Sequence, residues 1–408
     1  MADQTPSWTA AALPSSPHHR HQTSLEEVID TSAVQAPLNE AERAAAQGAF
    51  QRIVQHFEQE DTYHAESRAV RLTLYSKPQL VRYTYEFAQS VESKDIFLHS
   101  FFRALALDHA ASNANLDFAE IAPLFSAFAE YLIDQFFLPP STRKTPQPSP
   151  AIHSAVLRAQ GAFGDGSGAY VGTEERLATL RAECLVRDRH RCVITRKFSD
   201  PEYMQRIEEH GDGARDNDGV LFLDQEDLDF DFLEVAHILP HSLTKDRPDG
   251  AIDASRQAAL SILNMFDHGV VHLINGIDID RPRNALTLAP VMHSHFGAFH
   301  VYFEPVDGQY NTYRIQSFLT AQQNRALRLP VTRTLFVTDN RTIDPPLPRL
   351  LAIHRAIAHI LHLSGAGTYI DWILRDMEEY TVRADGSSAL GRLVSLGLGG
   401  WLDGAVCS

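Results

Sequence analysis

The stretch 232–303 constrains this chain more than any other, because it sets three polar residues among short apolar runs. His237 lies near the end of an apolar run that a proline closes, which is typical of a strand followed by a turn. After a long insertion, Asn284 precedes a second short apolar alternation, which predicts another strand. Pro290 suits the first turn of a helix that would carry His293. The pattern therefore predicts strand, strand and helix, with the three polar residues brought together.

Two histidines and one amide in this arrangement suit the hydrolysis of a phosphodiester bond. Imidazole near neutral pH can take a proton from water, and neutral imidazole can hold a divalent metal ion. One histidine as base and one as ligand, with an amide that fixes the loop, would form a phosphodiesterase core.

At these residues the sequence resembles the HNH endonuclease family, and particularly a branch that is common in filamentous fungi. His237, Asn284 and His293 match the three letters of that name in order. An upstream segment, Arg-Asp-Arg-His-Arg-Cys-Val-Ile-Thr at 187–195, is similar to the segment that opens such domains. The resemblance implies an α+β fold with an N-terminal helical region, a central HNH-like ββα-metal domain with insertions, and C-terminal helices.

The resemblance also implies a role for each motif residue. His237 would be the general base that activates water, Asn284 would orient the loop that bears this base, and His293 would bind the metal. The implied protein is a metal-dependent endonuclease that hydrolyses phosphodiester bonds in nucleic acid, with DNA as the first expectation and RNA as the second.

The sequence departs from the family pattern at two positions. Many family members carry a metal ligand immediately before the base and another four residues after the last histidine, where this chain has Ala236 and Gly297. Replacement ligands are then needed, and His241, Asp280 and His295 are the candidates. Such a set suits zinc, nickel or manganese better than magnesium, although the metal's identity stays open.

These departures keep a second interpretation open, a catalytically inactive HNH-fold protein that serves as a binding module or scaffold. The charge also supports it, since the formal net charge is −16. The stretch 174–305 holds 14 Lys and Arg against 24 Asp and Glu, which opposes simple binding to phosphates. Basic residues gather at 181–197 and at Arg281 and Arg283, and these last two are candidates for nucleic-acid contact. A serine hydrolase is disfavoured, because the chain lacks a Gly-x-Ser-x-Gly motif.

Composition and periodicity divide the chain into five segments. We expect a disordered tail at 1–38, a helical domain with its own apolar core at 39–137, a Pro/Gly-rich linker at 138–172, an HNH nuclease-like domain at 173–318, and a C-terminal helical extension packed on it at 319–408.

Individual elements can also be predicted. We expect strands at 192–195, 269–274 and 335–338, a hairpin turn at Asn275-Gly276, a hairpin of 299–305 with 310–318, and helices at 253–266, 350–363 and 369–380.

The rest of the sequence bounds the environment. No apolar run approaches 18 residues, and the first 30 residues lack the apolar core of a signal peptide. Three cysteines cannot form a disulfide framework, and Cys192, beside Val and Ile, is expected to be a core thiol. We therefore expect an intracellular protein of the nucleus or cytoplasm, with no membrane partner and with its oligomeric state open.

Overall fold

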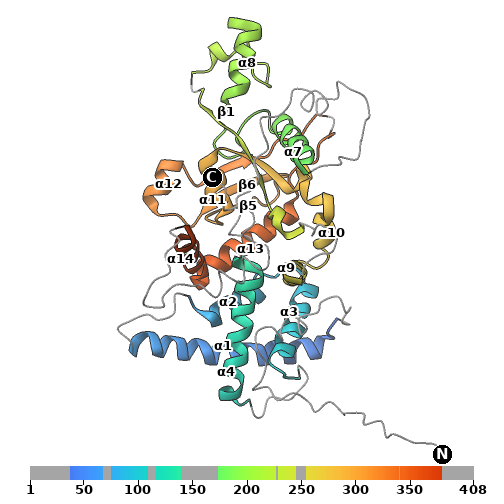
Figure 1. The fold of residues 1–408 in the computed structure, drawn as a ribbon, viewed down its shortest axis with the longest axis vertical. Coiled ribbons are helices and arrows are strands. Elements are labelled where there is room, and N and C mark those ends of the chain that lie inside the picture. Colours follow the sequence, from blue (N-terminus) through green and yellow to red (C-terminus); the bar gives the residue numbers. More distant parts are fainter. Residues whose placement is uncertain are drawn as a thin grey trace, which may run out of the picture.

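The computed structural model describes residues 37–67, 75–108, 116–138, 173–226, 228–244, 254–339 and 341–378. Within these ranges the molecule is a mixed α+β structure. In Figure 1, helices lie at one end, small sheets lie in the middle, and an insertion projects from the other end. The α+β class is therefore confirmed. Most of the expected tail and linker lie outside the described residues.

Four helices and a short π-helix build the N-terminal end, as the periodicity predicts. They are α1 (Glu40–Ser67), α2 (Lys77–Glu86), α3 (Val91–Ala104), α4 (Phe118–Leu132) and η3 (Ile133–Phe137). The first begins where a reciprocal cap forms, since the backbone N–H of Glu42 donates to Asn39 Oδ1 at 2.9 Å and that of Asn39 donates to Glu42 Oε2 at 3.0 Å.

These helices do not keep an apolar core to themselves, contrary to the expectation. Their buried Phe97 and Phe128 belong to one continuous cluster with Phe266 of α9 (Ala254–Phe266) and Ile357 of α13 (Pro348–Ser364). The Gln89 N–H also donates to the Phe266 carbonyl at 2.7 Å. The separate core was wrong because α3 packs against α9 and α2 packs against α13.

The centre of the molecule has the predicted order of strand, strand and helix. Strand β3 (Glu234–His237) pairs antiparallel with β4 (Ala285–Leu288), which leads into α11 (Pro290–Gly297). The buried Val235 and Ala285 pack against α7 (Thr173–Arg187), while the buried Leu286 and Leu288 belong to the main core with Met292 and Phe296 of α11. Between the strands lie η6 (His241–Thr244), α9, α10 (Val271–Ile274), η7 (Gly276–Asp280) and η8 (Pro282–Asn284).

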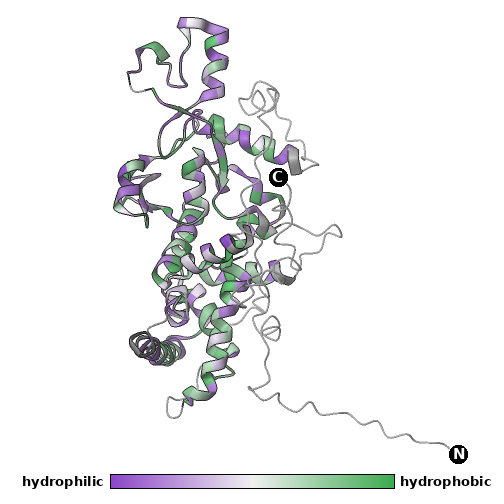
Figure 2. Ribbon diagram, turned by 60° about the vertical axis from the view of Figure 1, so that its left-hand side comes forward, coloured by the Kyte–Doolittle hydropathy of each residue, from purple (hydrophilic) through white to green (hydrophobic). Residues whose placement is uncertain are grey.

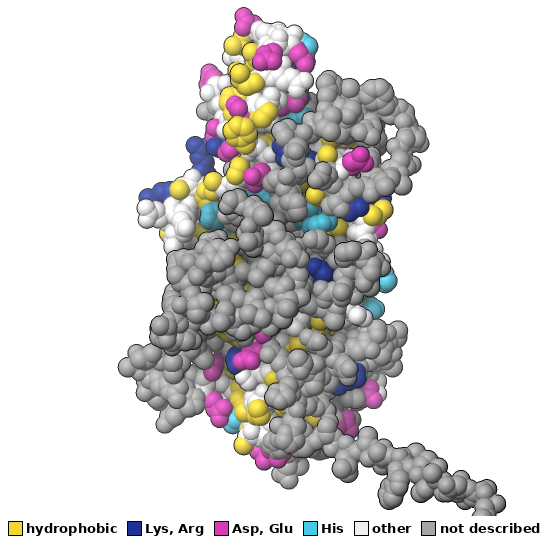
Figure 3. Space-filling view, in the orientation of Figure 1, with side chains coloured by type: hydrophobic (Ala, Val, Ile, Leu, Met, Phe, Trp, Pro, Cys, Tyr) yellow, Lys and Arg dark blue, Asp and Glu magenta, His cyan; other side chains and the backbone are white. Residues whose placement is uncertain are grey.

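The acidic stretch after residue 199 is the projecting insertion. It comprises β1 (Phe198–Ser199), α8 (Asp200–His210), η4 (Gly211–Gly213), η5 (Phe222–Asp224) and β2 (Phe230–Asp231). Strands β1 and β2 pair parallel, and a small core of Phe198, Ala214 and Phe222 holds the segment together. Helix α8 is mostly hydrophilic in Figure 2, and Asp and Glu side chains gather on this part in Figure 3.

A three-stranded sheet and three helices complete the described part of the fold. The elements are β5 (Val301–Pro305), β6 (Thr312–Ser317), α12 (Ala321–Leu327), β7 (Val331–Thr334), α13 and α14 (Ala366–Glu378). The expected hairpin is confirmed, and Gly308 in its turn has a φ of +72° that side chains rarely adopt. The predicted helices at 253–266, 350–363 and 369–380 correspond to α9, α13 and α14. In the ranges that the structure covers, no helix is both long and apolar enough to span a membrane.

Three of the predicted strands were wrong. Residues 192–195 form a turn, whose Val193 N–H donates to the carbonyl of Thr287 on β4. The stretch 269–274 contains helix α10, and Asn275-Gly276 leads into η7 instead of a hairpin. The third strand lies at Val331–Thr334 instead of 335–338. Short apolar runs do not distinguish a strand from a buried helical turn, which explains the first two errors.

Candidate active site

His237 ends β3, and its ring is enclosed. The side chain is 0% exposed, and its Nε2 lies 3.0 Å from Asp280 Oδ1. Its Nδ1 has no hydrogen-bond partner among the described residues. Burial lowers the pKa of His237, and the nearby His241 and His293 act in the same direction while Asp280 opposes them. The ring is therefore neutral near pH 7 and has one nitrogen without a partner.

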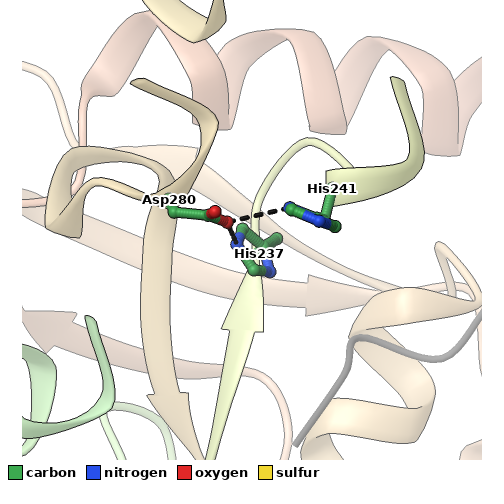
Figure 4. A group of neighbouring side chains, drawn as sticks. All are labelled: His237, His241 and Asp280. Carbon is green, nitrogen blue, oxygen red and sulfur yellow. Dashed lines mark hydrogen bonds and ion pairs between the residues drawn. The ribbon is translucent and has the colours of Figure 1, made fainter. Parts of the chain in front are cut away.

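Asp280, at the end of η7, is the centre of this group. Its side chain is 1% exposed and meets three partners, His237, His241 and Arg176. The Nδ1 of His241 lies 2.8 Å from Oδ1, and the Nε of Arg176 on α7 lies 3.3 Å from Oδ2. Although burial acts to raise the pKa of Asp280, the hydrogen bonds from the two histidines hold it below its usual range. Figure 4 shows Asp280 and His241 approaching the tip of β3 from opposite sides.

An ionised Asp280 fixes the tautomers of both rings. A carboxylate only accepts hydrogen bonds, so His237 must donate from Nε2 and His241 from Nδ1. In the neutral ring of His237, the proton then sits on Nε2 and the lone pair on Nδ1. This is the arrangement that a general base requires.

Asn284 is fully buried behind the loop that follows His237, as predicted. Its Oδ1 accepts from the N–H of Leu239 at 2.9 Å. Its Nδ2 donates to the carbonyls of Leu239 and Ile279, both at 3.0 Å. One amide thus ties the loop after His237 to the segment that carries Asp280.

His293 lies on α11 and is paired with a different carboxylate. Its Nδ1 is 2.7 Å from Oε2 of Glu234, the first residue of β3. If Nδ1 donates to this carboxylate, Nε2 retains its lone pair and can bind a metal. The ring of His293 lies on α11, which packs against β3, the strand that ends with the ring of His237. That both open into one cleft stays a prediction.

The remaining candidates divide between the centre and its surroundings. His241 and Asp280 lie with His237, and the ligand atoms of these three lie within 4.8 Å of one another. Two imidazoles and one carboxylate form a donor set that suits zinc or another transition metal. His295 is instead grouped with His300, with ring centroids 5.8 Å apart. Arg281 and Arg283 both contact Asp278, at 3.4 and 3.3 Å.

The two departures from the family pattern are visible in the fold. Ala236 is 0% exposed and belongs to the main core, and Gly297 ends α11. Neither position offers a donor atom from a side chain. A metal in this part of the molecule would rely on His237, His241 and Asp280, or on His293.

The segment 187–195 supports the site from behind. Arg187 is fully buried and forms a two-pronged ion pair with its neighbour Asp188, at 2.9 and 2.8 Å. The same guanidinium donates to the carbonyls of Pro282 and Ala285, on either side of Asn284. Cys192 is a buried core thiol, as expected.

Comparison with known families decides the nature of this region. Residues 192–304 match the model of the HNH endonuclease family. They form an HNH endonuclease domain. No curated protein and no solved structure matches the chain.

The HNH domain contains His237, Asn284 and His293, so the match includes the whole motif. Two residues of the centre had not been singled out as site residues, Glu234 and Arg176. The sequence offered a reason to single out Glu234, because it is the acidic residue of the strand that ends in His237. No sequence feature pointed to Arg176, because α7 precedes the HNH domain and contacts Asp280 only in the folded chain.

Proposed function

We propose that the HNH domain hydrolyses phosphodiester bonds in nucleic acid, with His237 as the general base. The observation that carries this proposal is the hydrogen-bonding pattern of His237. Its Nε2 is committed to the buried carboxylate of Asp280, and its Nδ1 has no partner among the described residues. The comparison with known families supports the reaction class.

The residues of the chain divide the work. His237 Nδ1 takes a proton from a water molecule as that water attacks phosphorus. Asp280, held by Arg176, stabilises the positive imidazolium that results. Asn284 keeps the loop after His237 in place and so keeps the base aligned.

A divalent metal would be held by side chains already present. The donor set of His237, His241 and Asp280 fits a transition metal, and His293 with Glu234 offers another imidazole. The chemistry that such an ion supplies is stabilisation of negative charge on the phosphate and the leaving oxygen. A metal on His237 Nε2 would require a proton on Nδ1, so His237 serves either as base or as ligand. We assign it as the base.

The test is cleavage of supercoiled plasmid DNA with zinc, nickel, manganese or magnesium. We expect nicking that depends on a transition metal and is weak with magnesium alone. His237→Ala should abolish nicking and leave metal affinity, measured by calorimetry, largely intact. The matched control is His272→Ala, which removes an exposed histidine on α10. If His237→Ala loses metal binding together with nicking, His237 is a ligand and not the base.

A second candidate function is a binding or scaffold module that keeps the HNH fold without activity. The donor-free positions Ala236 and Gly297 and the net charge of −16 favour it. Protein that binds none of the four metals and cuts neither DNA nor RNA would establish this candidate. A fungal branch of the family and a nuclear or cytoplasmic location remain predictions.

A further inference from the structure

Two arginines far apart in sequence meet between the turn 192–197 and strand β7. Arg196 Nη2 donates to the carbonyl of Thr334 at 2.6 Å, and Arg333 Nε donates to the carbonyl of Ile194 at 2.6 Å. The positive charge of each lies in the field of the other, and both side chains are partly buried. Arg196 also has a backbone φ of +66°, a conformation that side chains rarely adopt.

Within the described ranges, this pair has no counter-charge in contact. Among the described residues, no carboxylate forms an ion pair with Arg196 or Arg333, and Arg196 Nη1 is buried without a hydrogen-bond partner. Burial lowers the pKa of Arg196 to about 10, and the charge of Arg333 adds to the effect. Neighbouring arginines differ, because Arg189 pairs with Asp218 and Arg191 with Asp216.

A purely structural role does not explain the two charges. A neutral amide could donate to the same carbonyls, and burial of an unpaired charge costs free energy. An aromatic ring helps to hold the guanidinium, since Arg196 lies 4.1 Å from the centroid of Phe336 and Arg189 lies 5.1 Å from it. What the pair lacks, in the part of the chain that the structure describes, is an anion in direct contact.

We propose that Arg196 and Arg333 form a phosphate-binding subsite for the backbone of a nucleic acid. Guanidinium groups match phosphate oxygens in geometry and charge. The subsite adjoins the paired strands β3 and β4. The turn that bears Arg196 is hydrogen-bonded to β4, since the Val193 N–H donates to the Thr287 carbonyl at 2.9 Å. A phosphate held there belongs to the strand that reaches the motif residues. The inference rests on the proposed function only for the identity of the ligand.

The subsite also explains how an acidic protein can bind a polyanion. The sequence candidates Arg281 and Arg283 are partly neutralised by Asp278, whereas the new pair is not. In Figure 3, Lys and Arg side chains are visible at the edge between the projecting insertion and α12.

The experiment measures binding of fluorescent 20-mer DNA and RNA in EDTA, so that cleavage does not enter. Arg196→Gln/Arg333→Gln keeps N–H donors and removes two charges. The matched control, Arg325→Gln/Arg328→Gln, removes two exposed charges from the end of α12. We expect the first variant to bind at least about tenfold more weakly, and its salt dependence (log K against log salt) to lose a slope of about 1 to 2. The control should lose much less.

Further arms keep the outcome decisive. Arg196→Lys/Arg333→Lys restores the charge and should recover most of the affinity; the single variant Arg333→Gln serves if the double variant does not fold. Equal binding by the Gln variant and the control would overturn the proposal. So would binding of inorganic phosphate, measured by calorimetry, that depends on the two arginines while DNA and RNA binding does not. His237→Ala should bind as the wild type, so failure of hydrolysis and failure of this subsite are separate results.

Discussion

At the scale of single residues, two carboxylates orient the histidines of the site. Asp280 contacts His237 and His241, and Glu234 contacts His293. Glu234 accepts from His293 and so presents Nε2 of that ring. Mutation of a carboxylate that hydrogen-bonds to a metal-binding histidine typically lowers metal affinity by about 10- to 100-fold. We expect Glu234→Ala to weaken metal binding by about that factor, measured by calorimetry. Glu304→Ala is the control and should change little, because Glu304 on β5 accepts from Gln316 and, among the described residues, contacts none of the motif histidines. Unchanged affinity in Glu234→Ala would remove His293 from the metal site.

A second residue-scale consequence concerns acid. His354 of α13 donates from Nε2 to the carbonyl of Phe296 and stacks on that ring, with centroids 3.8 Å apart. Burial lowers the pKa of His354 to about 3 and that of His190 to about 4. Both are lowered from 6.5, so the unfolded chain binds more protons below that pH and the stability falls as the pH falls.

The loss of stability should begin near pH 6.5 as the pH falls. For each histidine it should approach about 1.4 kcal/mol per pH unit, down to the pKa of that histidine in the folded protein. Urea unfolding at pH 7 and pH 5 measures it. His354→Phe keeps an aromatic ring in the stack and cannot take a proton, so it should lose less stability between these pH values. An equal loss in this variant would show that His354 is not the group responsible.

At the scale of elements, a buried ion pair joins α7 to β4. Arg187 and Asp188 are both unexposed, and Asp188 also accepts from the backbone N–H of Thr287 at 3.1 Å. Removing one member of such a pair leaves an uncompensated charge and costs about 3–5 kcal/mol. We expect Arg187→Ala to destabilise the protein by that amount in urea unfolding. Arg189→Ala breaks a partly exposed pair with Asp218 and should cost about 0–1 kcal/mol.

The same elements show what the sequence could predict. Strands β3 and β4 and helix α11 were predicted in the right order, because their apolar alternation, the closing proline and Pro290 all agree. The contact of Asn284 with the loop after His237 was also expected from the motif, and its role in orienting the base stays a prediction. Arg176 and the meeting of Arg196 with Arg333 could not be predicted, since each depends on a contact between segments far apart in the chain. Helix α10 was missed because its four residues carry too little periodicity.

At the scale of the whole molecule, the N-terminal helices, the HNH domain and α13 share one core. Backbone hydrogen bonds cross between them, including Ser76 N–H to the Ser364 carbonyl at 2.9 Å. We therefore expect these parts to unfold together. In amide hydrogen exchange with increasing urea, protection in α3, α9 and α13 should be lost at one concentration. If α3 lost its protection well before α9, the result would instead support the independent helical domain that was first expected for 39–137.

The projecting insertion leads to a different kind of consequence. It leaves the body at β1 and returns at β2, and these strands pair side by side, with Phe198 opposite Phe230. A segment whose two ends are neighbours can be lengthened, shortened or exchanged for little more than the entropy of closing a loop. Since the insertion has a small core of its own, the rest of the fold gives up few apolar contacts in the exchange. The stretch 200–229 is therefore a suitable insertion site. A tag or a second folded module can replace it while the motif residues stay in place.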